Sequence, residues 1–190
     1  MRRLFVAINL NDENKAVLAQ IQDYYSELPL RWIKKQNFHI TLLFLGYIKE
    51  EIISEIEEIL SEISKNIHSF ELTIKNTSFE PNNFKPRMIW AKIQDSENLK
   101  ILQKEINNKL IGFCQKANNP NIKRFSNFNP HITMAKALPQ EIIDARSVPK
   151  SKEINLKIKV ESIELMESFL QSNGAEYKIV KSFNLSEKNA

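Results

Sequence analysis

The chain has 190 residues, a hydrophobic content of 42% and a formal net charge of +4 at pH 7, with a pI near 9.0. This length can bury a sizeable core, and no apolar run approaches the roughly 18 residues that a membrane span needs, so we expect no membrane partner. The excess of positive charge is small and supports a phosphate-bearing partner only weakly.

The N-terminal part of the chain predicts two strand–helix units. Residues 3–9 read as a buried strand, too short and without a cleavage site to be a signal peptide, so we expect a soluble, cytoplasmic protein. Asp12 is expected to cap a helix over 13–28. A strand over 38–46 closed by Gly46 and a helix over 49–67 follow. The apolar stripes of the two helices are Val17, Ile21, Tyr24 and Leu28, and Ile52, Ile56, Ile59, Ile63 and Ile67.

Residues 70–185 predict further strands around one long helix. Strands are expected over 70–79 and 86–93, and a helix is expected over 97–116. The apolar stripe of this helix is formed by Leu99, Leu102, Ile106, Leu110 and Phe113. Cys114, the single cysteine, excludes an intrachain disulfide and is expected to be buried on that helix. After the polar loop 116–124 come another strand, a short helical stretch at 140–147 and two apolar segments at 153–168 and 175–185. The last two are expected to pair antiparallel.

Strands and helices are mixed without strict alternation, which favours an α+β fold over a doubly wound parallel sheet. No linker, low-complexity tract or repeat interrupts the chain, so we expect residues 1–190 to form one domain. The only internal echo is a His-x-Thr triplet that occurs at two places, and it suggests two similar lobes.

The triplet stands in "NFHITLLFLG" at 37–46 and in "NPHITMAKA" at 129–137. With three histidines and four threonines in the chain, two such matches by chance have a probability of about one in a thousand. Side chains two apart on a strand share a face, so His39 lies beside Thr41, and His131 beside Thr133. Two such strands brought together would form a cleft floor with two imidazoles and two hydroxyls.

This set of groups suits acid–base chemistry on a phosphodiester. One neutral imidazole can activate a nucleophile while a protonated one gives a proton to the leaving oxygen, and the hydroxyls can donate to phosphate oxygens. No third metal ligand stands beside either triplet, and the three glycines form no phosphate loop. We therefore expect catalysis without a metal or a cofactor.

These motifs resemble the two-histidine (2H) phosphoesterase superfamily, and among its members the RNA 2′,3′-cyclic phosphodiesterases. The resemblance runs from about residue 2 to residue 185. It is carried by "RLFVAINL", "RWIKKQNFHITLLFLG", "KPRMIW", "FNPHITMAKA" and "IELMESFLQSNGAEYKIVKSFNL", the last with Ser168, Gly174 and Tyr177. It implies a bilobal fold of two antiparallel-rich sheets with helices outside and one His-x-Thr strand per lobe facing a central groove.

The resemblance also implies metal-independent hydrolysis of a terminal RNA 2′,3′-cyclic phosphate to a 2′-phosphate by a monomer. His39 would protonate the leaving 3′-oxygen and His131 would activate water. Thr41 and Thr133 would hold the phosphate, and Phe44 would stack on the terminal base.

One position departs from the family pattern. The second motif usually has arginine five residues after its histidine, and this chain has Lys136, a point charge in place of a planar fork. Strict alternation places Lys136 on the face opposite His131, so it reaches a phosphate only if the strand ends, twists or bulges first. Arg124 is a candidate substitute cation.

Three alternatives remain open at this point. The same groups can serve reversible ligation and cleavage at 2′,5′ linkages, or a small cyclic nucleotide can be the substrate. A nucleotide- or RNA-binding module without turnover is the alternative from another class. The third histidine, His68, is expected at the surface or in a capping role.

Overall fold

The computed structural model describes residues 1–82, 85–117, 122, 128–137, 148–171 and 174–187, and its strands form two antiparallel sheets. The four-stranded sheet has the order β3-β1-β8-β9, made of Arg2–Asn9 (β1), His39–Ile48 (β3), Ser162–Gln171 (β8) and Gly174–Asn184 (β9). The five-stranded sheet has the order β2-β6-β5-β4-β7, made of Arg31–Trp32 (β2), Phe70–Glu80 (β4), Met88–Ile93 (β5), His131–Lys136 (β6) and Glu153–Val160 (β7). The expected α+β class is confirmed.

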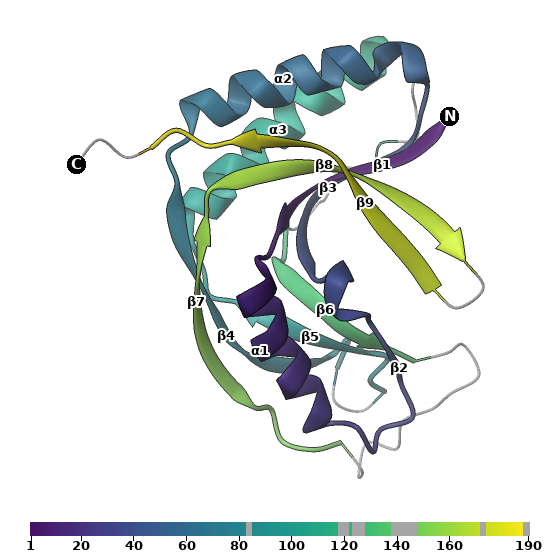
Figure 1. Ribbon diagram of the computed structural model, residues 1–190, viewed down its shortest axis with the longest axis vertical. Helices are drawn as coiled ribbons and strands as arrows, with labels where there is room; N and C mark the ends of the chain where they lie inside the picture. Colours follow the sequence, from purple (N-terminus) through teal and green to yellow (C-terminus); the bar gives the residue numbers. More distant parts are fainter. Residues whose placement is uncertain (83–84, 118–121, 123–127, 138–147, 172–173, 188–190) are drawn as a thin grey trace.

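Three helices cover the sheets (Figure 1): α1 (Asp12–Asp23), α2 (Ile53–Asn66) and α3 (Glu97–Lys116). Helix α1 packs on the five-stranded sheet, where Gln22 Nε2 donates to the Met134 carbonyl at 2.8 Å. Helix α2 packs on the four-stranded sheet together with α3. Two short 3₁₀ helices, Lys35–Asn37 (η1) and Glu50–Ile52 (η2), precede β3 and α2.

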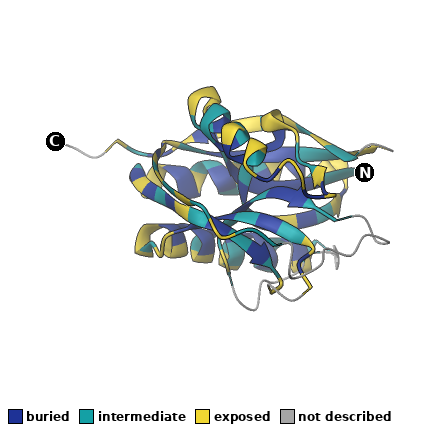
Figure 2. Ribbon diagram, turned by 90° about the horizontal axis from the view of Figure 1, so that it is seen from below, coloured by how far each residue is buried: buried dark blue, intermediate teal, exposed yellow. Residues whose placement is uncertain are grey.

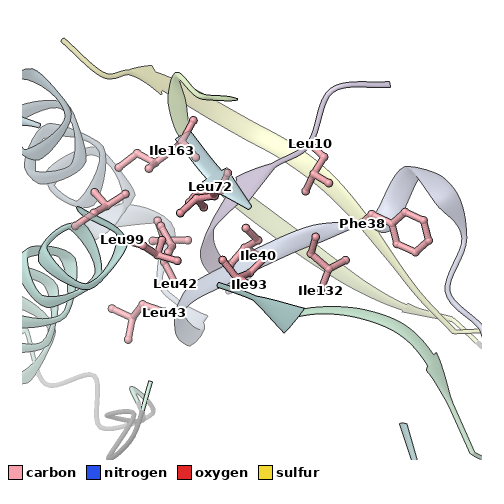
Figure 3. Packing of buried hydrophobic residues seen from close by; sticks show 14 of the residues in the cluster. Leu10, Phe38, Ile40, Leu42, Leu43, Leu72, Ile93, Leu99, Ile132 and Ile163 are labelled. Atoms are coloured by element: carbon pink, nitrogen blue, oxygen red, sulfur yellow. The ribbon is translucent and has the colours of Figure 1, made fainter. Parts of the chain in front are cut away.

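The two sheets share one hydrophobic core because the chain passes repeatedly from one sheet to the other. Leu42 and Ile163 from the four-stranded sheet lie in the same cluster as Leu72, Ile93 and Ile132 from the five-stranded sheet (Figure 3). Buried positions follow the strands and the inner sides of the helices, and the outer helix surfaces are exposed (Figure 2). This common core fixes the position of β3 relative to β6.

Helix α1 differs from the expectation at both ends. Its N-cap is Asn11, whose side chain accepts the Asn14 N–H at 2.8 Å, and not Asp12. It ends at Asp23 and not at residue 28, because residues 24–27 form turns; Pro29 disfavours helical geometry only at Leu28.

The buried faces of α1 and α2 are rotated from the expected stripes. On α1, Leu18 and Ile21 are buried, whereas Val17 is half-buried and Tyr24 is exposed. On α2, which begins only at residue 53, the buried residues are Ile53, Ile56, Leu60, Ile63 and Ser64. The expected positions Ile52, Ile59 and Ile67 are partly exposed and lie at the edge of the core. Both helices therefore bury an apolar face as predicted, but the centre of each buried face lies to one side of the predicted stripe.

The remaining elements confirm most expectations. Helix α3 spans the expected residues 97–116, Cys114 on it is buried, and β8 pairs with β9 antiparallel. The segment 153–168 is not one strand, because the chain leaves the five-stranded sheet at Glu161 and continues as β8 in the other sheet. Strand β3 continues past Gly46, which has φ +77°, to Ile48. The expected helical stretch 140–147 and Arg124 lie outside the described residues.

Candidate active site

Strands β3 and β6 lie next to each other where the two sheets meet (Figure 1). A pocket of about 350 Å³ opens between them. All six residues that the sequence singled out line this pocket: His39, Thr41, Phe44, His131, Thr133 and Lys136. The tertiary structure thus joins two motifs that are far apart in the chain into one site.

A β-bulge in β6 brings Lys136 into the pocket. Thr133 lies opposite Trp90 of β5 but Ala135 lies opposite Ile89, so Met134 is an extra residue in β6. Lys136 then lies opposite Met88. Trp90 and Met88 are two residues apart and both line the pocket, which places Lys136 on the same face as Thr133. Strict alternation would have placed it on the opposite face.

Strand β3 carries a bulge at the equivalent position. Thr41 lies opposite Ala7 and Leu43 opposite Val6, so Leu42 is the extra residue. The bulge puts Phe44 in phase with Thr41, and its side chain is 47% exposed. In both strands the residue after the threonine bulges, and the residue five places after the histidine therefore faces the pocket.

The two imidazoles are held in the same tautomer. His39 Nδ1 lies 2.7 Å from the Asn37 carbonyl oxygen, and His131 Nδ1 lies 2.8 Å from that of Asn129. A carbonyl only accepts, so each Nδ1 carries a proton and donates it, and each Nε2 keeps its lone pair when the ring is neutral. Nε2 of His39 is 3.0 Å from Thr41 Oγ1.

The sequence motifs led to no predicted role for Asn37 and Asn129, although the repeat extends to Asn-x-His-Ile-Thr at both places. Asn37 makes a second contact, this time through its side chain: Nδ2 donates to the Ala175 carbonyl at 2.8 Å. Asn37 thereby ties the start of β3 to the start of β9.

Aromatic rings surround the imidazoles differently. His39 lies 5.1 Å from Phe5 and 5.0 Å from Tyr177, with ring planes inclined by 44° and 84°. His131 is stacked on Trp90 at 3.6 Å with planes inclined by 10°. Trp90 and Tyr177 line the pocket and belong to segments of the family resemblance, but the sequence assigned them no role.

The pKa of His39 is lowered to about 4, chiefly by burial and in smaller part by the nearby charges of His131, Lys136 and Lys15, while its hydrogen bond to Asn37 opposes the decrease. Burial also lowers the pKa of His131, whereas the bond to Asn129 and the charge of Glu80 oppose this. Both rings are therefore neutral at pH 7.

Burial lowers the pKa of Lys136 too, and the charges of Arg31 and Arg3 act in the same direction. The lysine therefore lies in a region of positive potential, which favours an anionic ligand.

Other features of the described residues bear on the class of site. No group of three His, Cys, Asp or Glu among them could hold a metal ion. Within the same residues, no helix is long and apolar enough to cross a membrane. His68 is exposed at the junction of α2 and β4, and its Nδ1 lies 3.2 Å from the Glu187 carbonyl oxygen, as expected for a surface residue.

Comparisons with known proteins identify the family of this chain. Residues 8–90 match the model of the LigT like Phosphoesterase family. An RNA 2′,3′-cyclic phosphodiesterase of Thermotoga maritima is 28% identical over 94% of this chain and 92% of its own length. A protein of that name from Aquifex aeolicus is 31% identical over 82% of this chain and 81% of its own length.

Solved structures show the same fold. The protein TT0787 of Thermus thermophilus superposes with a TM-score of 0.82 at 24% identity, over 98% of this chain and 100% of the other. E. coli LigT complexed with 3′-AMP gives 0.75 at 21% identity, over 98% of each chain. By sequence and by fold, the chain belongs to the RNA 2′,3′-cyclic phosphodiesterase family of LigT-like, two-histidine phosphoesterases.

Proposed function

We propose that this protein hydrolyses RNA ends carrying a 2′,3′-cyclic phosphate to 2′-phosphates, by acid–base catalysis with two histidines and without a metal ion. The observation that carries the proposal is the matched pair of imidazoles in one pocket, each with Nδ1 bound to a carbonyl and Nε2 left for proton transfer. The names of the Thermotoga maritima and Aquifex aeolicus relatives support the substrate class.

In the proposed reaction His131 Nε2 takes a proton from water, whose oxygen attacks the phosphorus atom. The bond from phosphorus to the 3′-oxygen breaks, and His39 Nε2–H gives its proton to that oxygen. The product keeps the phosphate on the 2′-oxygen. One proton is taken up by His131 and one is lost from His39, so solvent must restore both rings before the next turnover.

His39 must be protonated to act as the acid, although burial lowers its pKa to about 4 in the free protein. A phosphate anion between the rings would raise the pKa of both imidazoles, because an opposite charge in a partly buried site favours the protonated form. Burial lowers the pKa of His131 as well, although the charge of Glu80 opposes that decrease. For His39 to act as the acid, the bound substrate has to favour protonation of His39 over protonation of His131. The assigned roles therefore require that the substrate raises the pKa of His39 more than that of His131.

The proposed phosphate contacts are the hydroxyls of Thr41 and Thr133 and the ammonium of Lys136. Thr41 Oγ1 is bonded to His39 Nε2 in the free protein. Protonation turns Nε2 from an acceptor into a donor, so the hydroxyl proton of Thr41 becomes available to a phosphate oxygen. Phe44, exposed at the pocket, is the proposed platform for the terminal base.

Action as a monomer is part of the proposal, because a single chain supplies both histidines and Lys136 to the groove. The shared core of the two sheets supports a single domain. Ligation at 2′,5′ linkages and a binding-only module remain the alternatives, and both are outcomes of the test below.

The test uses a short RNA ending in a 2′,3′-cyclic phosphate, incubated with chelator and with wild type, His39→Ala or His131→Ala; His68→Ala is the control for loss of a histidine. We expect 2′-phosphate from the wild type and the control only. Activity that disappears with chelator would refute the metal-free mechanism, and full activity of either groove variant would remove that histidine from its role. Tight binding without turnover would identify a binding module, and joined products a ligase.

A further inference from the structure

A second cavity of about 100 Å³ adjoins the pocket that holds the two histidines. The two share the residues Ile33, Asn37, Lys136 and Tyr177. Its other walls are the region around β2, Gln171 at the end of β8, and Gly174, Ala175 and Glu176 at the start of β9. We call this cavity the annex.

The annex is lined by three cations, Arg31, Lys34 and Lys136. Arg31 lies directly opposite Lys136 in the pairing of β2 with β6. Among the residues that the structure describes, none of the three forms an ion pair with a carboxylate. Arg3 adds to the positive charge around Lys136 and Tyr177, and its Nη1 bonds to the Ser168 hydroxyl at 3.3 Å.

One carboxylate also lines the annex. Glu176 Oε2 accepts a hydrogen bond from Gln171 Nε2 at 3.0 Å, and both side chains are at the exposed end of the β8–β9 pair. Among the described residues that line the annex, one carboxylate does not balance three cations, so these residues together carry a net positive charge. Like charges gathered in a concave surface repel one another, and an anion bound among them relieves that repulsion.

We propose that the annex binds the phosphodiester on the 5′ side of the terminal nucleotide, so that the protein prefers RNA chain ends to free nucleoside cyclic phosphates. The inference rests on the proposed function. The terminal nucleotide carries its cyclic phosphate on one side of the ribose and its 5′-phosphate on the other. The two phosphates of one nucleotide therefore need neighbouring subsites. Lys136 lines both cavities and stands between the two subsites, with Arg31 and Lys34 on the annex side.

The position of Phe44 agrees with this path. Phe44 lines the histidine pocket but not the annex, so a base stacked on it leaves the cationic side for the backbone. Backbone phosphates bind to arginine and lysine without reading the sequence, so this contact would add affinity for any RNA end.

The test compares two substrates with the same terminal nucleoside: a nucleoside 2′,3′-cyclic phosphate and a dinucleotide ending in 2′,3′-cyclic phosphate. Arg31 and Lys34 are exposed, so Arg31→Gln with Lys34→Gln is expected to fold. The matched control, Lys65→Gln with Lys104→Gln, removes two exposed charges from α2 and α3.

For the annex double variant we expect kcat/KM on the dinucleotide to fall about tenfold, while the mononucleotide changes less than about twofold. The increase of KM with salt concentration should also become weaker, because a charged contact that salt would screen has been removed. The control variant should keep both substrates at wild-type values. Equal losses on the two substrates, or no loss on the dinucleotide, would overturn the inference.

Binding separates failure of the inference from failure of the proposed function. Calorimetric Kd values for a dinucleotide ending in 2′-phosphate and for a nucleoside 2′-phosphate need no turnover. If the wild type binds the dinucleotide more tightly and the annex double variant loses that difference, the annex assignment holds even for an inactive protein. If the difference is absent from the wild type, the annex assignment is wrong, whether or not the protein hydrolyses cyclic phosphates.

Discussion

The indole of Trp90 lies flat on the imidazole of His131, with ring centroids 3.6 Å apart and planes inclined by 10°. His39 has no such partner among the described rings: its neighbours Phe5 and Tyr177 are tilted or perpendicular at about 5 Å. A cation above an indole face is stabilised by the ring quadrupole. Two histidines in the same Asn-x-His-Ile-Thr pattern thus acquire different aromatic surroundings from the strands beside them.

Removing this face should lower the pKa of His131. For Trp90→Leu we expect a decrease of about half a unit to one unit, since a partly buried cation–π contact contributes roughly 1 kcal/mol. The measurement is an NMR pH titration of the His131 ring. Trp90→Phe is the matched variant that keeps an aromatic face. Replacing the indole breaks no hydrogen bond, because Trp90 Nε1 is buried and has no hydrogen-bond partner among the described residues. An unchanged titration in Trp90→Leu would show that stacking does not tune His131.

Lys136 should contribute to turnover, because the bulge at Met134 turns its side chain into the pocket. We expect Lys136→Ala to lower kcat by about tenfold to a hundredfold, because a hydrogen bond to a charged group contributes roughly 1.5–3 kcal/mol. Lys136→Arg should hold or raise the rate, since its planar fork can grip two phosphate oxygens. Steady-state kinetics on the cyclic-phosphate RNA provide the comparison. A wild-type rate in Lys136→Ala would refute the phosphate contact.

The buried imidazole of His39 should make stability depend on pH. Its pKa is about 4 when folded, against 6.5 as the ordinary value, so the unfolded chain binds more protons between these pH values. The contribution of His39 to the free energy of unfolding is therefore present in full above pH 6.5. It decreases by roughly 3 kcal/mol as the pH falls to 4. Urea denaturation of wild type and His39→Gln at pH 7.5 and 4.5 measures this; the variant should lose less stability on acidification. His68→Gln, at an exposed site, should lose as much stability on acidification as the wild type. If His39→Gln also loses as much as the wild type, His39 is not the source of the pH dependence.

Phe44 should affect substrate binding more than chemistry. Phe44 is not part of the hydrophobic core and its side chain is 47% exposed, so Phe44→Ala should leave the protein folded. We expect KM for the RNA to rise by about tenfold with kcat nearly unchanged, because stacking of one base contributes about 1–3 kcal/mol. Phe44→Tyr should preserve KM. A KM unchanged in Phe44→Ala would exclude the stacking role.

Local sequence patterns were sufficient for several parts of the fold and site. The bounds of α3 and the buried alternation of Phe70, Leu72 and Ile74 in β4 are confirmed, since both depend on side-chain period alone. The two His-x-Thr pairs follow from the same period. The passage of residues 153–168 from one sheet to the other could not be read locally, because a strand pattern does not specify its pairing partner.

By itself, the sequence determined that each histidine shares a strand face with its threonine, because side chains two residues apart point the same way. Only the tertiary structure decided that Phe44 and Lys136 join them. Pairing of β3 with β1, and of β6 with β5, leaves Leu42 and Met134 as extra residues, and each bulge shifts the following side chains to the other face. The same packing buries both imidazoles and gathers cations around Lys136, so the pKa values of the site come from neighbours far apart in the chain.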